Sequence, residues 1–317
     1  MPHSCNTFAA DPVAPGPTIA LVVEGIDWHA RMLTKAFASL GARAITISLR
    51  SCGIETQTMS GLNFAGLGER LPDAVLVRSM SGGTFQAVTL RLGILHALRE
   101  LDVLVWNDAR AIERCVDKST TSFLLTRAGI ATPPAWAVES QESARTIVRR
   151  ESAQGPLVLK PLFGSQGRGL KLIRTADDLP NPDVVAGVYY LQRYVGVEGN
   201  EGFRDFRLLV SQGRVIAAMA RRAVNWITNV KQGGLPMAVV ADKDMKELAV
   251  RATAVVGAEF AGVDILYGCD GRLTVLEVNS MPAWSGLQKV TPAGIALILA
   301  RDLVAALAAR AGRGATM

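Results

Sequence analysis

The chain has 317 residues, of which 49% are hydrophobic and 20% are charged, a composition typical of globular proteins rather than disordered or fibrous ones. At roughly 150 residues per domain, this length predicts about two domains. Lys and Arg number 34 against 28 Asp and Glu, and the resulting charge of +6 favours anionic partners without choosing among nucleotides, acidic metabolites and nucleic acid.

Cysteine and histidine usage bears on compartment and on metal chemistry. The four cysteines form no CxxC pair and the three histidines are scattered, so neither a disulfide framework nor a structural zinc site is expected. This pattern fits a reducing cytoplasm. The sequence shows neither a run of 18 apolar residues nor a signal-peptide pattern, so we expect no membrane partner.

The first third of the chain alternates predicted strands and helices. After a proline-containing flexible tail at 1–17, strands are predicted at 19–24, 44–49, 74–77 and 103–106, and helices at 28–40 and 85–101. Such alternation predicts a parallel sheet covered by helices, which we assign to an N-terminal domain over 18–114.

The pattern changes to hairpins after a further predicted helix and the pair Pro133-Pro134. Asp117 is a candidate N-cap of that helix, which ends at Gly129. The predicted hairpins pair 157–160 with 170–173, 206–210 with 215–220, and 262–267 with 273–279, and helices follow the pattern at 245–257 and 291–309. We place a central subdomain at 115–195 and a C-terminal one at 196–317.

A lysine and a glycine-rich loop follow the strand predicted at 157–160. Lys160 ends the strand, and the sequence Phe-Gly-Ser-Gln-Gly-Arg-Gly follows at 163–169. Glycines let backbone N–H groups approach a polyanionic phosphate, and a lysine at a strand end can pair with it as a point charge. An ordinary hairpin with an exposed lysine is the alternative.

Two carboxylates and an amide come together in the last predicted hairpin. The turn Asp270-Gly271 places Asp264 directly opposite Glu277, and Asn279 shares the face of Glu277 because side chains alternate along a strand. Carboxylates this close in an apolar hairpin repel unless a cation lies among them, and oxygen ligands favour Mg²⁺ or Mn²⁺ over zinc. A solvent-facing polar stripe is the alternative.

The middle hairpin carries arginines. With Gln212-Gly213 as its turn, one face is predicted to hold Asp205, Arg207, Ala220 and Arg222. Asp205 and Arg207 form an ordinary ion pair in one interpretation, whereas Arg222 favours an anionic ligand. In the loop at 225–234, Asn229 suits phosphate contact, and Trp226 is interpreted as a packing residue.

Several common sites are excluded by inspection. The sequence has no GK dipeptide and hence no Walker A phosphate loop, and it has no GxSxG or HExxH motif. It shows no recognisable nucleic-acid-binding module, so we expect no nucleic-acid partner.

The order of these pieces resembles the ATP-grasp ligases. Within them the chain is most similar to the glutamate-adding, RimK-like branch and to relatives that append glutamate to tetrahydromethanopterin or deazaflavin coenzymes. The resemblance runs from about Ile19 to the C-terminal helix. The segments that carry it are 73–78, 117–118, 159–160, 164–169, 192–194, 205–207, 221–222, 229, 233–234, 261–266 and 276–282.

The resemblance implies an α/β fold, in which the N-terminal parallel-sheet domain precedes two α+β subdomains that clamp ATP. It implies two Mg²⁺ or Mn²⁺ ions held by Asp264, Glu277 and Asn279. It implies that ATP contacts Lys118, Lys160, Gly164, Ser165, Gln166, Gly167, Gln192, Arg193, Tyr194, Val195, Asp205 and Asn229. Arg222, with Arg207, would steady an acyl-phosphate, and Arg78 and Trp284 would lie at the substrate.

Two positions depart from the family pattern. Arg193 stands where these ligases commonly carry an acidic residue, so the adenine contacts differ there. After Asn279 the family usually has a proline followed by glycine, whereas here Pro282 is followed by Ala283-Trp284. Trp284 stacks on a flat substrate ring in one interpretation and packs in the core in the other, which we favour.

The resemblance therefore predicts an ADP-forming ligase that adds L-glutamate, or aspartate, to a carboxylate-bearing cofactor such as a tetrahydromethanopterin-type pterin, or to a protein or peptide tail. The expected partners are a small-molecule carboxylate and an acidic amino acid, and the expected state is a cytoplasmic homo-oligomer. The alternatives are another ATP-grasp reaction such as amino-acid ligation, a non-catalytic nucleotide-binding regulator, and nucleic-acid binding driven by the positive charge.

Overall fold

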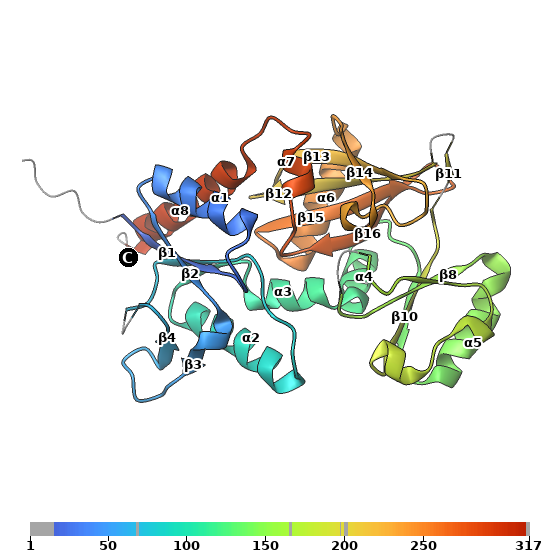
Figure 1. Cartoon of the computed structure of the whole chain (residues 1–317), viewed down its shortest axis with the longest axis horizontal. Coiled ribbons are helices and arrows are strands. Elements are labelled where there is room, and N and C mark those ends of the chain that lie inside the picture. The colour runs from blue at the N-terminus through green and yellow to red at the C-terminus, as the bar shows by residue number, and fades with distance from the viewer. Residues whose placement is uncertain (1–15, 68–69, 165–166, 197, 200–201, 315–317) are drawn as a thin grey trace, which may run out of the picture.

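The computed structural model describes residues 16–314 except 68–69, 165–166, 197 and 200–201. The three largest of its four sheets follow one another along the chain, and Figure 1 shows them as an N-terminal part, a central sheet and a small lobe at the far side. One parallel sheet followed by two antiparallel sheets is the layout that the sequence predicts. The two predicted residues Ser165 and Gln166 lie outside the described part of the chain.

The N-terminal sheet has the strand order β2-β1-β5-β6, and all three of its strand pairs are parallel. Helices cover both faces of the sheet, so the alternating side chains of β1 enter two cores. Ile19 and Leu21 pack with α1 and with the C-terminal helix α8 (Ile295–Gly314), and Ala20 and Val22 pack with α2 and α3. These elements are β1 (Thr18–Val22), α1 (Trp28–Ser39), β2 (Arg43–Ile47), β5 (Ala74–Val77), α2 (Phe85–Glu100), β6 (Leu104–Trp106) and α3 (Ala109–Val116).

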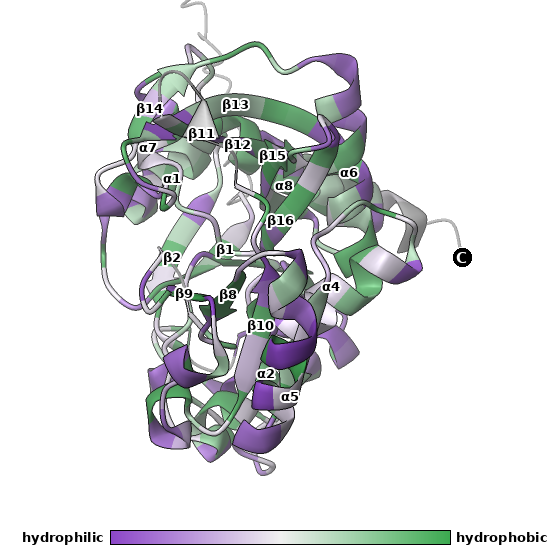
Figure 2. Ribbon diagram, turned by 90° about the vertical axis from the view of Figure 1, so that its right-hand side faces the viewer, coloured by the Kyte–Doolittle hydropathy of each residue, from purple (hydrophilic) through white to green (hydrophobic). Residues whose placement is uncertain are grey.

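The second sheet forms the small lobe and has the order β7-β10-β8-β9, with antiparallel pairs throughout. Helix α4 (Lys118–Arg127) leads into it, and the predicted N-cap Asp117 accepts hydrogen bonds from the backbone N–H groups of Ser119 and Thr120. The lobe contains β7 (Ala135–Val138), α5 (Gln141–Glu151), β8 (Leu157–Lys160), β9 (Lys171–Ile173) and β10 (Tyr189–Arg193). In Figure 2, α5 is coloured mainly as hydrophilic, as its place on the outside of the lobe requires.

The third sheet is antiparallel, with the order β14-β13-β12-β15-β16 and the short β11 beside β12. Its strands are largely apolar and pack against α6, and β15 is buried along nearly its whole length. The elements are β11 (Glu198–Gly199), β12 (Gly202–Ser211), β13 (Arg214–Ala223), β14 (Leu235–Ala238), α6 (Lys243–Val256), β15 (Phe260–Tyr267), β16 (Leu273–Asn279), α7 (Ser285–Gln288) and α8 (Ile295–Gly314).

The remaining short elements lie in the connections. A small hairpin pairs β3 with β4 beside the N-terminal sheet. The elements are η1 (Leu49–Ser51), β3 (Cys52–Ile54), β4 (Leu62–Phe64), η2 (Ser152–Gln154), η3 (Ala176–Asp178), η4 (Pro182–Val185) and η5 (Val230–Gln232). Among the described residues, no helix is both long and apolar enough to cross a lipid bilayer.

The N-terminal part is joined to the third sheet by buried polar and apolar contacts. The side-chain amide of Asn107 donates to the carbonyls of Phe260 (2.7 Å) and Ser280 (2.6 Å), and its oxygen accepts from the backbone N–H groups of Glu259 and Phe260. The C-terminal helix α8 returns to pack on α1, in a core that also contains Trp284. These contacts fix the end of β16 against the N-terminal sheet.

Candidate active site

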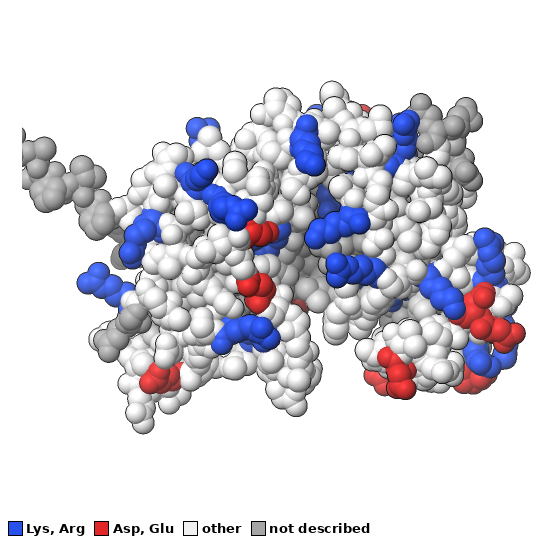
Figure 3. Space-filling model, in the orientation of Figure 1, with Lys and Arg blue, Asp and Glu red and all other residues white. Residues whose placement is uncertain are grey.

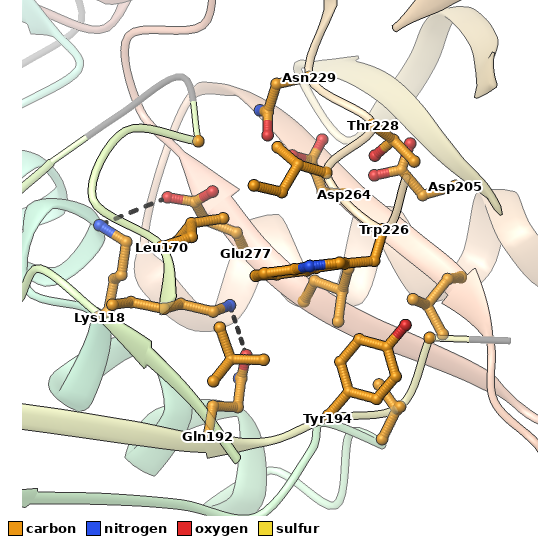
Figure 4. A pocket seen from close by; sticks show the side chains of 18 of the residues that line it. Lys118, Leu170, Gln192, Tyr194, Asp205, Trp226, Thr228, Asn229, Asp264 and Glu277 are labelled. Carbon is orange, nitrogen blue, oxygen red and sulfur yellow. Dashed lines mark hydrogen bonds and ion pairs between the residues drawn. The ribbon is translucent and has the colours of Figure 1, made fainter. Parts of the chain in front are cut away.

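A cleft lies between the small lobe and the third sheet. Figure 3 shows Lys and Arg side chains gathered around the hollow in the middle of the molecule, and Figure 4 shows the cleft itself. The predicted site residues that line it are Lys118, Lys160, Gly164, Gly167, Gln192, Arg193, Tyr194, Val195, Asp205, Asn229, Asp264 and Glu277. Segments from all parts of the predicted nucleotide site thus meet in one place.

Two carboxylates lie at the inner wall of the cleft. Asp264 of β15 pairs directly with Glu277 of β16, which is the predicted pair. The pairs next to the turn, such as Ile265 with Val275, are one residue away from the predicted register, and a bulge between Asp264 and Ile265 makes up the difference. Glu277 faces the cleft, and its Oε1 lies 3.7 Å from the Nζ of Lys118. Asn279 does not line the cleft, and its buried Nδ2 has no hydrogen-bond partner among the described residues.

Asp264 is neutralised by two arginines. Arg207 donates to both of its oxygens at 2.7 Å, and the Nη2 of Arg221 lies 3.0 Å from Oδ2. Burial alone would raise the pKa of Asp264, but the two guanidinium groups hold it down to about 2. The carboxylate is therefore ionised throughout the physiological pH range. Asp205 pairs with the same Arg221, so the four side chains form one buried, charge-balanced chain.

The predicted register of the arginine hairpin is wrong by one residue. The turn at Gln212-Gly213 is correct, but a bulge between Leu209 and Val210 shifts every later pair, so Asp205 opposes Arg221 and not Ala220. Arg222 consequently lies on the other face of β13, opposite Arg204, and it does not line the cleft. Arg221, which the sequence did not single out, occupies the position that was predicted for Arg222.

Two lysines approach the cleft from the small lobe and from α4. The Nζ of Lys118, at the first residue of α4, donates to the carbonyl of Gly164 at 2.8 Å. Lys160, at the end of β8, donates to the Oε1 of Gln192. Burial lowers the pKa of Lys160 to about 8, against the opposing attraction of Glu277. Both ammonium groups face the carboxylate wall, which makes the cleft suited to a polyanion and a divalent cation together.

The glycine-rich loop closes against the loop that carries Asn229. A Cβ at Gly167 would lie 2.5 Å from the Oδ1 of Asn229 and 2.9 Å from Ile227, and its φ of +70° also favours glycine. The glycine-rich loop of the small lobe and the Asn229 loop of the third sheet therefore contact each other across the cleft, and Gly167 leaves no room there for a side chain.

The side chain of Arg193 points away from the cleft. Its guanidinium bonds the carboxylate and the carbonyl of Glu151 and lies 5.8 Å from the ring centroid of Trp136. The backbone N–H groups of Arg193 and Tyr194 donate to Pro134 and Pro156. The guanidinium and the backbone N–H of Arg193 are therefore both occupied by protein partners, and neither serves the predicted contact with adenine.

Trp226 lines the cleft, contrary to its interpretation as a packing residue. Its ring stands edge-on to that of Tyr194, with 5.9 Å between the centroids, and Figure 4 shows it lying across the space above Gln192. The cleft thus has an aromatic and aliphatic end, to which Val158 and Leu276 also contribute, and a charged end at the two carboxylates. A flat base and a phosphate chain match these two ends.

Arg78 and Trp284 lie outside the cleft. Trp284 is fully buried, as the packing interpretation expects, so its ring is closed to a substrate. Its backbone N–H donates to the Nε2 of His29 at 3.1 Å. Arg78 donates to the carbonyl of Met281, and its Nη2 lies 4.0 Å from the carboxylate of Asp27, the N-cap of α1. The contacts of Trp284 with His29 and of Arg78 with Met281 hold the segment after β16 against the N-terminal part.

Comparison with known proteins agrees with this geometry. Residues 115–303 match the RimK-like ATP-grasp domain. The chain is 31% identical over 299 residues to the tetrahydromethanopterin:alpha-L-glutamate ligase of Methanosarcina acetivorans, covering 82% of this chain and 90% of that one. It is 30% identical to a probable alpha-L-glutamate ligase of Rhodopirellula baltica, and the match covers 77% of this chain and 63% of that one.

Solved structures share the fold at lower identity. The ATP-grasp ligase PsnB in complex with a minimal precursor superposes with a TM-score of 0.70 at 22% identity, covering 91% of this chain and 98% of PsnB. The D-cycloserine synthetase DcsG superposes with a TM-score of 0.68 at 19% identity, covering 92% and 99%. The chain therefore belongs to the RimK-like ATP-grasp family and is an ADP-forming carboxylate–amine ligase.

Proposed function

We propose that this ligase adds L-glutamate, or secondarily aspartate, to the carboxylate of a cofactor such as a tetrahydromethanopterin-type pterin, or of a protein or peptide tail. The single observation that carries the proposal is the cleft in which Lys118 and Lys160 face Asp264 and Glu277. The names of the relatives, which include tetrahydromethanopterin:alpha-L-glutamate ligases, support the choice of glutamate.

The reaction needs two balanced steps. An oxygen of the acceptor carboxylate attacks the γ-phosphorus of ATP, the bond to the bridging oxygen breaks, and ADP leaves with the electron pair. The amine nitrogen of the amino acid then attacks the acyl carbon, phosphate leaves, and the nitrogen loses a proton to give the amide. The protein contributes position and positive charge, because negative charge develops on the transferred group in each step.

The donor set of the inner wall fits a hard divalent cation. It offers the oxygens of Glu277 and Asp264, and Mg²⁺ in such sites commonly binds one or two carboxylates together with substrate phosphates. Asn279 lies outside the cleft lining, two residues after Glu277 on the same face of β16. The Oδ2 of Asp264 is contacted by both Arg207 and Arg221, but its Oδ1 accepts from Arg207 alone and keeps a second lone pair. We propose that these residues hold two Mg²⁺ or Mn²⁺ ions, which neutralise phosphate charge when bound.

The arginines divide between the two sides of the carboxylate wall. Arg221 lines the nucleotide cleft, whereas the Nε of Arg207 lies 3.8 Å from the position of a Cβ on Gly262, beside Pro282. Arg207 therefore faces the segment that leads to the N-terminal part. We propose that Arg207 steadies the acyl-phosphate and that Lys118 and Lys160 hold the ATP phosphates. Arg222, on the other face of β13, has no part in this proposal.

A coupled assay tests the proposal. The protein is incubated with ATP, Mg²⁺, one amino acid and one carboxylate acceptor, and both ADP and the mass of the product are measured. We expect ADP release that depends on glutamate and an acceptor mass increased by one glutamyl unit. Turnover only with neutral or basic amino acids would refute the acidic-substrate assignment and favour another amino-acid ligation. ATP binding without any amide product across the panel would favour the nucleotide-binding regulator.

A further inference from the structure

Three side chains of the N-terminal part each bind one backbone group of the segment 280–284, which follows β16. They are Asn107 at Ser280, Arg78 at Met281 and His29 at Trp284. The first two donate to carbonyl groups, whereas the Nε2 of His29 accepts from an N–H group at 3.1 Å. Because an imidazole nitrogen accepts only when it carries no proton, this third contact depends on the protonation state of the ring.

The carboxylate of Asp27 selects the form of the imidazole that can accept. Its Oδ2 lies 2.9 Å from the Nδ1 of His29, and its Oδ1 accepts from the backbone N–H of Ala30 at 2.8 Å. Because an ionised carboxylate only accepts, the proton of the neutral ring is on Nδ1 and the lone pair of Nε2 faces Trp284. The N-cap of α1 therefore also sets the tautomer of His29.

The surroundings of His29 favour this neutral form. The ring is buried, and the charged side chains that act on it among the described residues are Asp27 at the start of α1, Arg78 after β5 and Lys231 in η5. Burial, followed by the charge of Arg78, lowers the pKa of His29 against the opposing effect of Asp27. A second ring proton would also set a donor against the N–H of Trp284.

The 280–284 segment borders the carboxylate wall on the side of Arg207. A Cβ on Gly262 of β15 would lie 2.8 Å from the Cβ of Pro282 and 3.8 Å from the Nε of Arg207, so the proline and the guanidinium meet at the same glycine. Arg207 in turn donates to both oxygens of Asp264. A displacement of Pro282 would therefore reach the arginine and the carboxylate of the site.

We propose that His29 is a positioning residue for the ligation reaction: its neutral Nδ1–H form fixes Trp284 and thereby keeps Pro282 and Arg207 in place. The inference rests on the proposed role of Arg207 at the acyl-phosphate. His29 is not among the residues that line the cleft. Loss of its hydrogen bond should therefore lower kcat and leave the KM for ATP unchanged.

Two amide side chains test the hydrogen bond. The oxygen of His29→Gln reaches the place of Nε2 and accepts from Trp284, whereas the shorter His29→Asn places its amide at Nδ1 and leaves that N–H unpaired. With the substrate pair that the coupled assay identifies, His29→Asn should lose about tenfold in kcat and change the KM for ATP by less than about twofold. His29→Gln should stay within about threefold of the wild-type kcat. His96→Asn, on the exposed side of α2, is the matched control and should keep that kcat.

The tautomer gives a second test, which holds even if the Asn variant of His29 fails to fold. In Asp27→Asn the oxygen stays toward the N–H of Ala30, so the N-cap is kept and the NH₂ group turns toward His29. Nδ1 then accepts, the ring proton moves to Nε2, and the bond to Trp284 is lost. At about pH 7.5, ¹⁵N NMR of histidine-labelled protein should show His29 as Nδ1–H in wild type and as Nε2–H in Asp27→Asn. The kcat of Asp27→Asn should fall about tenfold.

The outcomes separate this inference from the proposed function. Equal losses of kcat in His29→Gln and His29→Asn, wild-type kcat in Asp27→Asn, or the Nε2–H tautomer in wild type would overturn the positioning role alone. A KM for ATP that rises as much as kcat falls would also overturn it, because the contact would then support the nucleotide cleft as a whole. A wild-type protein that forms no amide with any substrate pair would refute the proposed function and this inference with it.

Discussion

The guanidinium carbon of Arg78 lies 5.2 Å from the ring centroid of Trp284, so a cation of the N-terminal sheet is held against an aromatic ring that solvent does not reach. The ring also stands edge-on to His29, at 4.6 Å between centroids. Burial, followed by the charge of Arg78, lowers the pKa of His29, so this imidazole is neutral at physiological pH and can accept from the N–H of Trp284. The segment after β16 is thus held by an aromatic cluster.

We expect Trp284→Ala to destabilise the fold rather than to alter substrate choice. Removal of a fully buried tryptophan costs about 3–5 kcal/mol in free energy of unfolding, measured by urea denaturation. Phe85→Ala, which truncates an aromatic ring that is 82% exposed, is the matched control and should change stability little. Unchanged stability with an altered KM for the acceptor would instead identify Trp284 as a substrate contact.

ATP affinity should fall as the pH rises above about 8. Burial lowers the pKa of Lys160 to about 8, so its ammonium group is lost there instead of near 10.5. The dissociation constant for ATP should increase roughly tenfold between pH 7 and pH 9, as measured by calorimetry. Lys160→Met should bind ATP weakly and show a flat profile, whereas Lys246→Met, on the exposed side of α6, should keep the wild-type one.

The same shift affects stability with a defined sign. Between pH 8 and pH 10.5 the unfolded chain binds a proton at Lys160 that the folded protein does not bind. The contribution of Lys160 to the free energy of unfolding should therefore increase as the pH rises through that window. A greater loss of stability in wild type than in Lys160→Met over that window would contradict the assignment.

Gly167→Ala should weaken ATP binding while leaving most of the fold intact. The added Cβ would meet Asn229 at 2.5 Å, so the glycine-rich loop must move away from the opposite loop. We expect roughly a tenfold loss of affinity, or about 1.4 kcal/mol. Gly213→Ala, at the β12–β13 turn, has a similar positive φ of +68° but no neighbour within 4 Å, and it isolates the backbone cost. Equal ATP affinities in both variants would show that the loop contact is dispensable.

Turnover should depend on a divalent cation and on Glu277. Glu277→Gln keeps the shape of the side chain and removes the charge that faces Lys118, so ADP formation should fall by at least a hundredfold, or about 2.7 kcal/mol. Excess chelator should abolish activity, and added Mg²⁺ should restore it. Full activity in chelator, or undiminished turnover in the variant, would disprove the metal assignment.

The local turns could be predicted from the sequence because they depend on two or three neighbouring residues. Gln212-Gly213 forms the predicted turn. At Asp270-Gly271 the strands pair one residue away from the predicted register, and the bulge between Asp264 and Ile265 restores the predicted pairing of Asp264 with Glu277. The bulge after Leu209 could not be predicted, since the mismatch arises from packing between strands and no residue signals it. Because this bulge shifts the register by one residue, Arg221 and not Arg222 lies at the cleft.

Contacts between different sheets could not be predicted from the sequence either. The predicted glycine-rich loop and Asn229 both line the cleft, but their mutual contact depends on how two sheets are placed. The residues around Trp226 in the sequence do not distinguish a tryptophan that lines a cleft from one that packs in a core. Only the arrangement of β10 and the 224–234 loop shows that Trp226 faces Tyr194. The sequence gives no sign that Arg193 pairs with Glu151, because the two residues lie 42 positions apart and meet only when β10 packs beside the end of α5.

The return of α8 to α1 has a consequence for how the protein unfolds. The homologous region at 115–303 contains the whole cleft, yet its last helix completes a core with residues of β1 and α1, and Asn107 satisfies four backbone groups of the third sheet. Excision of that region would expose Leu299 and Leu303 and leave buried peptide groups without partners. The N-terminal part thus completes the core of the region that contains the cleft. Heating should therefore unfold the two parts in a single cooperative transition.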